Sequence, residues 1–216
     1  KELSADYTFN HGNVDQKCDN VDDYQRYLGK YFCGSITGKC GILYQDIDIT
    51  LAGTYVVECK GYSNTTKAKL FAGVLDPNNE NKMVDGTMNS TMLNQVSNMS
   101  ATEQDALHTA KHNMDYAGKA FYDNLKYMNS VVLTVPKSVF ENANGKPVHI
   151  RLGVMTGEYS KVVAPADDEW TVFDDFRLQF ASTNTDQDLL LDEMRADLNY
   201  LYDTPNKYET PPLHLH

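Results

Sequence analysis

Aromatic and acidic side chains gather around one segment near the end of the chain. Tyr159 and Trp170 flank a loop over residues 161–169, Asp168 lies within that loop, and Tyr62 follows an earlier strand-like run. Planar rings pack against the apolar faces of sugar rings, and nearby carboxylates accept hydrogen bonds from hydroxyl groups. These four residues form the predicted ligand-binding set, although a large aromatic such as Trp170 suits a protein core equally well.

The same loop offers a second kind of chemistry, because it is rich in carboxylates: Glu158, Asp167, Asp168 and Glu169. Two facing carboxyl groups act as acid and base in glycoside hydrolysis. In a chain with a formal charge of -11, however, most surface loops carry such pairs, so a solvated acidic loop is the favoured interpretation. The Gly-x-Ser-x-Gly motif of serine hydrolases is missing.

The strand predicted within residues 167–180 places a carboxylate among apolar side chains. Period-two alternation puts Asp174 on one face with Phe176, Leu178 and Phe180, and it puts Asp175 on the other. Burial of an unpaired carboxylate is very costly. Asp174 therefore requires either a bound cation or several backbone N–H donors.

Two motifs match known sites only in part. His108 and His112 are four residues apart on a predicted helix, which is a spacing able to bind a metal, but the glutamate of the zinc-protease motif is missing. Two surface histidines are the favoured interpretation. The segment from Cys33 to Cys40 approaches a phosphate-binding loop but has cysteine at its first and last positions, which disfavours nucleotide binding.

Cysteines occur only near the beginning of the chain, at Cys18, Cys33, Cys40 and Cys59. They allow three disulfide connectivities, and the turn-rich segment between Cys33 and Cys40 favours a bridge between those two. Cys59 alternates with Tyr55 and Val57, which fits a small buried side chain. Zinc is disfavoured because no closely spaced cysteine pair is present.

Composition limits the partners of the chain. The 216 residues have a pI of about 4.9, so the chain has no electrostatic attraction to nucleic-acid phosphates. No apolar run reaches the roughly 18 residues of a membrane helix, and the first residues do not form a signal peptide. The 14 tyrosines and the many Asn, Ser and Thr residues favour an exported protein.

Short β-forming runs separated by turns predict most of the secondary structure. They cover residues 42–60 (two strands around a turn at 52–53), 68–74, 130–135, 148–155 and 167–180. Several short strands with such punctuation predict an all-β sandwich, and the chain is long enough to bury a real core.

The segment 76–128 departs from the β pattern. Ser100 to Glu103 form a capping box, and apolar residues follow it at helical spacing: Leu107, Ala110, Met114, Ala117 and Phe121. This pattern predicts a helix over about 101–114, extending toward Asn124, that packs on the sandwich by its apolar face. Long excursions of this kind are often functional.

The end of the chain is predicted to be an extension of the domain. A polar linker covers residues 181–188, and four apolar residues then recur at helical spacing: Leu191, Met194, Leu198 and Leu201. We therefore divide the chain into a module over residues 1–183 and a linker and extension over residues 184–216.

Four segments together resemble a known family: Gly53–Tyr62, Ala68–Gly73, Val148–Val154 and Glu169–Leu178. They resemble the galactose-binding-like jelly-roll domains, which are similar to carbohydrate-binding modules, of Bacteroides-type secreted or surface modular proteins. The resemblance covers residues 40–180, and the W-x-x-F-D-D-F-x-L pattern that begins at Trp170 is its most specific part.

The resemblance implies an all-β fold, a two-sheet antiparallel jelly-roll sandwich that carries the helical insertion. It implies a non-catalytic carbohydrate-binding module of an exported multimodular protein, with a glycan and neighbouring modules as partners. It also implies a structural Ca²⁺ near the paired Asp residues of the last strand, with Asp174 as a ligand. By their position in the chain, Asp6 and Asn10 are the candidates for its N-terminal partner. A structural spacer or protein-docking domain is the alternative, and a glycoside hydrolase is a third reading.

Overall fold

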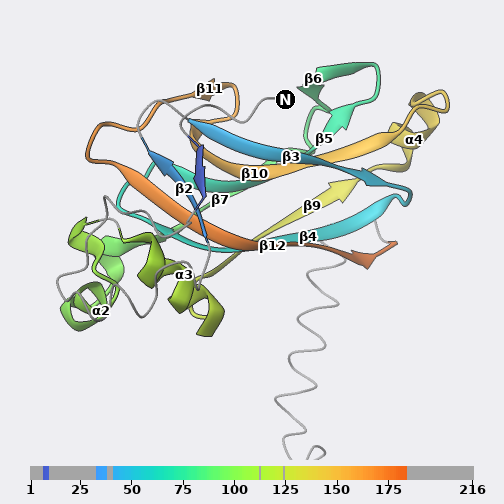
Figure 1. Ribbon diagram of the computed structural model, residues 1–216. Helices are drawn as coiled ribbons and strands as arrows, with labels where there is room; N and C mark the ends of the chain where they lie inside the picture. The colour runs from blue at the N-terminus through green and yellow to red at the C-terminus, as the bar shows by residue number, and fades with distance from the viewer. Residues whose placement is uncertain (1–6, 10–32, 38–40, 112, 124, 184–216) are drawn as a thin grey trace, which may run out of the picture.

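The computed structural model describes residues 7–9, 33–37, 41–111, 113–123 and 125–183 (Figure 1). The strands are β1 (Tyr7–Phe9), β2 (Gly34–Thr37), β3 (Ile42–Ile49), β4 (Gly53–Ser63), β5 (Ala68–Asp76), β6 (Asn79–Met83), β7 (Asn89–Met92), β8 (Asn94–Gln95), β9 (Met128–Val135), β10 (Val148–Glu158), β11 (Lys161–Val162) and β12 (Trp170–Ser182). The helices are α2 (Ala101–Ala106), α3 (Met114–Asp123) and α4 (Lys137–Asn142), with 3-10 turns η1 (Val96–Asn98) and η2 (Thr109–Lys111).

The principal strands form two sheets that face each other (Figure 1). The first sheet has the order β2-β12-β4-β9, with β1 beside β2 and a short parallel β8 beside β4. The second has the order β3-β10-β5-β7, with β11 beside β10 and β6 beside β5. Successive principal strands change sheet at every step except from β5 to β7, which is the strand order of a jelly roll. The predicted two-sheet antiparallel jelly-roll sandwich is confirmed.

The core between the sheets follows from the alternation that the sequence shows. In β4, β5 and β10 every second side chain points into this space and is buried, while its neighbours point outward. The inward set includes Tyr55, Val57, Cys59, Leu70, Ala72, Val74, Ile150, Leu152 and Val154. Burial of these side chains is the main stabilisation of the sandwich, at roughly 1.5–3 kcal/mol for each large aliphatic group.

The helical insertion covers one end of the outer face of the first sheet. Figure 1 shows α2 and α3 beside the end of the sheet where β12 begins. Met114, Ala117 and Phe121 of α3 are buried and belong to one apolar cluster with Tyr62 and Trp170. The predicted packing of a helix by its apolar face is confirmed for α3.

The continuous helix predicted over 101–114 is wrong, because the chain turns sharply at His108. This residue has a positive φ of 51°, which interrupts a right-handed helix. Its ring lies 4.0 Å from the ring of Tyr116, measured between centroids. The predicted pair of histidines on one helix face is therefore not formed by α2, and His112 lies outside the described residues.

Three short strands within the 76–128 excursion, β6, β7 and β8, were not predicted. β7 pairs with β5 and completes the second sheet, from Lys69 opposite Met92 to Ala72 opposite Asn89. Its side chains are exposed or only partly buried, so it lacks the apolar alternation that marks the other strands. Part of the excursion thus belongs to the sandwich itself.

A β-bulge in β12 changes the side on which Asp174 lies. The pairing with β4 shifts register between Asp174 and Arg177, and Asp175 has a positive φ of 52°. Phe173 and Leu178 both pack into the core between the sheets, although strict alternation would separate them. Alternation from Phe173 therefore turns Asp174 away from that core, and the prediction that it shares a face with Leu178 is wrong.

Both cysteines that the structure describes are free thiols. Cys33 is buried at 1% exposure, and its Sγ donates a hydrogen bond to the Met114 carbonyl oxygen at 3.4 Å. The predicted Cys33–Cys40 bridge is therefore not formed. Cys59 is a buried core residue, as predicted, whereas Cys18 and Cys40 lie outside the described residues.

Two further expectations concern the extension at the end of the chain and the absence of a membrane-spanning helix. The predicted extension over 184–216 lies outside them, so the boundary at residue 183 stays a prediction. Across the described ranges, no helix is long and apolar enough to cross a membrane.

The N-cap of α2 gives a first testable prediction. The Ser100 hydroxyl oxygen accepts a hydrogen bond from the Glu103 backbone N–H at 3.2 Å. Ser100→Ala should lower the free energy of unfolding by about 1 kcal/mol, because it leaves this N–H without its partner. Chemical denaturation measures the effect, with Ser97→Ala as the control. Equal stability of the two variants would contradict the role of the cap.

Candidate functional site

Two of the four predicted ligand-binding residues lie in the core. Tyr62 and Trp170 are 1% and 8% exposed, and their ring centroids are 5.9 Å apart in an edge-to-face arrangement. Tyr62 also packs edge-to-face on Phe121 of α3, at 5.5 Å. The interpretation of Tyr62 and Trp170 as exposed stacking surfaces is corrected: the helical insertion covers this face of the sheet.

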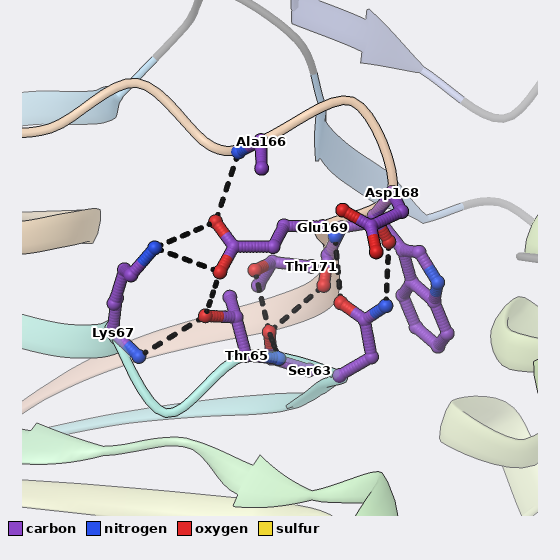
Figure 2. A network of polar contacts seen from close by, with 9 residues as sticks. Ser63, Thr65, Lys67, Ala166, Asp168, Glu169 and Thr171 are labelled. Carbon is purple, nitrogen blue, oxygen red and sulfur yellow. Dashed lines mark hydrogen bonds and ion pairs between the residues drawn. The ribbon is translucent and has the colours of Figure 1, made fainter.

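The acidic loop before β12 is held by a polar network rather than left open (Figure 2). Glu169 Oε1 accepts hydrogen bonds from Thr65 Oγ1 at 2.9 Å and from Lys67 Nζ at 2.8 Å. Its Oε2 accepts one from the Ala166 backbone N–H at 2.9 Å. The contacts with Thr65 and Lys67 join the loop to the turn between β4 and β5. The same contacts, with that of Lys67 the largest, lower the pKa of Glu169 to about 2.

Neighbouring groups continue this attachment. Asn64 Nδ2 donates to the backbone oxygen of Asp168 at 2.7 Å, and the Trp170 N–H donates to Asn64 Oδ1 at 2.7 Å. Ser63 Oγ donates to the Trp170 carbonyl oxygen at 2.8 Å and lies 2.9 Å from Thr171 Oγ1. Asp168 is exposed, and its backbone oxygen, rather than its carboxylate, accepts the hydrogen bond that holds the loop. The network positions the start of β12.

The low pKa of Glu169 gives a second prediction. Since this pKa lies below its ordinary value of about 4.5, the stabilisation is complete at neutral pH and is lost as the pH falls toward 2. Glu169→Gln should lower the free energy of unfolding at pH 7 by about 2 kcal/mol, allowing for solvent screening of Lys67. The difference between variant and wild type should shrink below pH 4.

Denaturation curves between pH 2 and pH 7 measure this effect, with Asp167→Asn in the same loop as the control. A Glu169→Gln variant that loses the same stability at every pH would contradict an electrostatic role.

Asp174 and Asp175 are accompanied by a buried lysine. Lys60 Nζ lies 3.2 Å from Asp175 Oδ2 and donates a hydrogen bond to the Phe121 carbonyl oxygen at 2.5 Å. Arg177 Nη2 donates to Asp175 Oδ2 at 2.7 Å, and these contacts lower the pKa of Asp175. Burial raises the pKa of Asp174, while the charge of Lys60 opposes that shift. Lys60 thus supplies a positive charge beside both carboxylates.

The calcium prediction concerns the same place. Within the described ranges, no group of three or more His, Cys, Asp or Glu side chains is arranged to hold a metal ion. The other predicted ligand, Asp6, lies outside those ranges, so Ca²⁺ at Asp174 stays a prediction. The arrangement that the structure does show, two carboxylates beside Lys60, does not require a metal.

Chelation tests the calcium prediction. If Ca²⁺ stabilises β12, a chelator should lower the melting temperature of the wild type, and excess Ca²⁺ should restore it. Asp174→Asn should show little of this response. Identical melting of the wild type with chelator and with excess Ca²⁺ would contradict the prediction and leave Lys60 as the compensating charge.

The remaining predicted residue, Tyr159, belongs to a different face. It lies in the turn between β10 and β11, where its ring packs on Phe71 with 5.5 Å between centroids. Phe71 and Met155 point outward from the second sheet and are fully buried beneath their neighbours. Tyr159 itself is partly exposed. The four predicted residues therefore do not form one site.

An arginine on this outer face joins three other side chains. Arg151 of β10 donates from Nε and Nη2 to the two carboxylate oxygens of Asp46, at 2.7 and 2.8 Å. Its Nη1 donates to the Tyr159 hydroxyl at 2.9 Å, and its guanidinium carbon lies 4.0 Å from the ring centroid of Tyr44. The carboxylate of Asp46 raises the pKa of Arg151. The group stays charged, and both tyrosines are held in place.

The strand pairing explains why these residues meet. β3 and β10 are antiparallel, with Arg151 opposite Asp46 and Gly153 opposite Tyr44. Gly153 matters here because a Cβ at this position would lie 2.0 Å from the Leu43 carbonyl oxygen and 2.7 Å from the Tyr44 Cα. The absence of a side chain thus lets β3 approach closely next to Tyr44.

A hollow of about 210 Å³ adjoins this group of residues. It is lined by Asp46, Leu75, Asp76, Pro77, Lys146, Pro147 and His149. Asp46 belongs to both features, since its carboxylate binds Arg151 and its side chain lines the hollow. His149 Nδ1 lies 2.7 Å from Asp48 Oδ1 on the same face. Aromatic surface and several hydrogen-bonding groups therefore occur side by side.

We name the Tyr44 face by its residues: Tyr44, Asp46, Arg151 and Tyr159, with the adjoining hollow. Sequence reasoning found Tyr159 and missed the others. Arg151 and Tyr44 both occur in predicted strands, but nothing in the sequence gives the register that brings the two strands together.

No protein-family model and no curated protein sequence matches the chain. Similar solved structures include TmCBM61 in complex with β-1,4-galactotriose, at 12% identity and a TM-score of 0.36 over 82% of this chain and 84% of that one. Another is described as CBM4, at 13% identity and a TM-score of 0.34 over 69% and 68%. Similarity at this level decides neither function nor ligand.

Proposed function

We propose that the chain is a non-catalytic carbohydrate-binding module whose glycan lies across the Tyr44 face. The observation that carries the proposal is the fixed position of two partly exposed tyrosines, Tyr44 and Tyr159, by one buried guanidinium, that of Arg151. Aromatic rings held in a fixed plane lose little entropy when a sugar packs on them.

Polar groups beside the rings fit the hydroxyls of a sugar. Asp46 is bound to Arg151 but keeps an exposed edge, with 31% of its side chain accessible. Lys69 and Glu158 form an ion pair at the other end of the same sheet face. A carboxylate and an ammonium group supply an acceptor and donors next to an apolar ring, which is the combination that sugar-binding surfaces need.

The carboxylates near this face are poorly suited to glycoside hydrolysis. That reaction needs a carboxylic acid that is still protonated near neutral pH. Asp46 and Glu158 are each paired with a cation. Glu169, in the loop before β12, has a pKa of about 2. This pairing supports binding without catalysis.

The wider setting of the module belongs to the same proposal. An exported multimodular protein of the Bacteroides type, with neighbouring modules along the chain, follows from the resemblance of the four sequence segments. A spacer or protein-docking domain without a sugar ligand is the alternative function. Exposed Tyr122 and Leu125, 76% and 65% accessible at the end of α3, are the observation that favours a protein contact.

A glycan array followed by calorimetry tests the proposal. Wild-type protein should bind at least one neutral polysaccharide or oligosaccharide, and Tyr44→Ala should weaken that binding by about tenfold or more, since it removes a ring and the stacking partner of Arg151. Tyr159→Phe, which removes only the hydroxyl bonded to Arg151, should have a smaller effect in the same direction.

Two controls make the result specific. Tyr122→Ala, on α3, should bind like the wild type. Trp170→Ala should lower stability by about 3–5 kcal/mol because it empties a core position, and it reports on folding rather than on binding. Binding that survives Tyr44→Ala but is lost in Tyr122→Ala would contradict the proposed face and favour α3.

A further inference from the structure

A second cavity lies at the other end of the molecule, between β8 and α2. Its volume is about 370 Å³, and it is lined by Met92, Leu93, Asn94, Gln95, Asn98, Met99, Glu103, Lys126 and Tyr127. Small-molecule sites in proteins begin at roughly 300 Å³. It shares no residue with the Tyr44 face or its hollow, and Figure 1 shows α2 and α4 at opposite ends of the sandwich.

Polar side chains of the cavity are held by bonds to the protein behind them. Asn94 Nδ2 donates to Asn129 Oδ1 at 3.1 Å, and Asn129, itself buried, also accepts from the Asn94 N–H at 2.8 Å. Gln95 Nε2 donates to the Leu93 carbonyl oxygen at 2.8 Å. Each amide group is thereby fixed through its NH₂, which orients its oxygen before any ligand arrives.

The charged groups of the cavity neutralise each other. Glu103 Oε2 lies 2.7 Å from Lys126 Nζ, and Glu103 Oε1 accepts a hydrogen bond from the Tyr127 hydroxyl at 2.8 Å. Lys126, with smaller contributions from Tyr127 and the Ser100 backbone N–H of the capping box, lowers the pKa of Glu103. The carboxylate therefore stays ionised and paired, and the cavity offers no net charge to attract an ion.

Apolar surface completes the lining. Leu93 is fully buried, Met99 is partly buried, and Met92 is 49% exposed. Thioether side chains adapt to irregular ligand surfaces. Fixed amides, an ion pair without net charge and flexible apolar groups together suit a neutral molecule that carries several hydroxyl groups.

We propose that this cavity is a second ligand site, which binds a single neutral sugar unit of a glycan. The proposal takes its ligand class from the proposed function but depends on none of the residues of the Tyr44 face. Asn94, Gln95 and Asn98 hydrogen-bond the hydroxyls, and Met92 and Met99 cover the apolar side of the sugar ring. A module with both sites holds a glycan at two places or two glycan chains at once.

NMR titration tests the second site with defined probes. Uniformly ¹⁵N-labelled protein is titrated with methyl β-D-glucopyranoside and with methyl β-D-galactopyranoside, in the wild type and in Tyr44→Ala. At least one glycoside should shift the resonances of residues 94–99, with the same affinity in both proteins. Asn98→Ala should weaken that response by about fivefold, the effect of one lost hydrogen bond, whereas the matched control Ser97→Ala should not.

The outcomes separate the two sites. Shifts at residues 94–99 without shifts on the Tyr44 face would support the cavity and contradict the proposed function. Shifts confined to the Tyr44 face, shifts at 94–99 that vanish in Tyr44→Ala, or an unchanged affinity in Asn98→Ala would overturn the cavity site. If neither glycoside shifts residues 94–99 in either protein, the cavity site is likewise overturned.

Discussion

The arrangement of the side chains on the outer face of the second sheet depends on the guanidinium group of Arg151. This residue is only 8% exposed, and a charge so deeply placed needs partners for its donors. It finds a bidentate carboxylate in Asp46, a hydroxyl in Tyr159 and a ring face in Tyr44. One side chain thereby ties β3, β10 and the turn before β11 together. The tyrosines are held in place before a ligand arrives, which lowers the entropic cost of binding.

Each of the two sheets has an outer face that points away from the core, and the two outer faces have different roles. One end of the outer face of the first sheet is covered by the helical insertion, so Tyr62 and Trp170 contribute to stability there. The outer face of the second sheet keeps partly exposed aromatic and charged groups. The polar network around Glu169 fixes the start of β12 (Figure 2). The function we propose follows from this division between a covered face and an accessible one.

Strands and caps could be predicted from local sequence, whereas departures from regular geometry could not. Period-two alternation located β4, β5 and β10 because their inward side chains must be apolar. Ser100 revealed the start of α2 through its capping bond. The positive φ values at His108 and Asp175 were missed, because non-glycine residues adopt them only when tertiary contacts compensate. At Asp175 those contacts are the ion pairs with Lys60 and Arg177.

The candidate site was predictable only in part for a related reason. Tyr159 stands out because it flanks a polar turn, but Asp46 and Arg151 are 105 positions apart, and only the register of β3 with β10 joins them. Trp170 was wrongly predicted to be exposed, because the burial of an aromatic residue depends on what covers it. Here a helix from a distant part of the chain covers it.

The central claim is that a glycan contacts the two tyrosines that Arg151 positions. Intermolecular NOEs between the protons of a bound oligosaccharide and the ring protons of the protein test it most directly. A glycan on the Tyr44 face should give NOEs from its sugar ring protons to both Tyr44 and Tyr159. NOEs that reach only residues of α3, such as Tyr122, with none to Tyr44 or Tyr159, would contradict it.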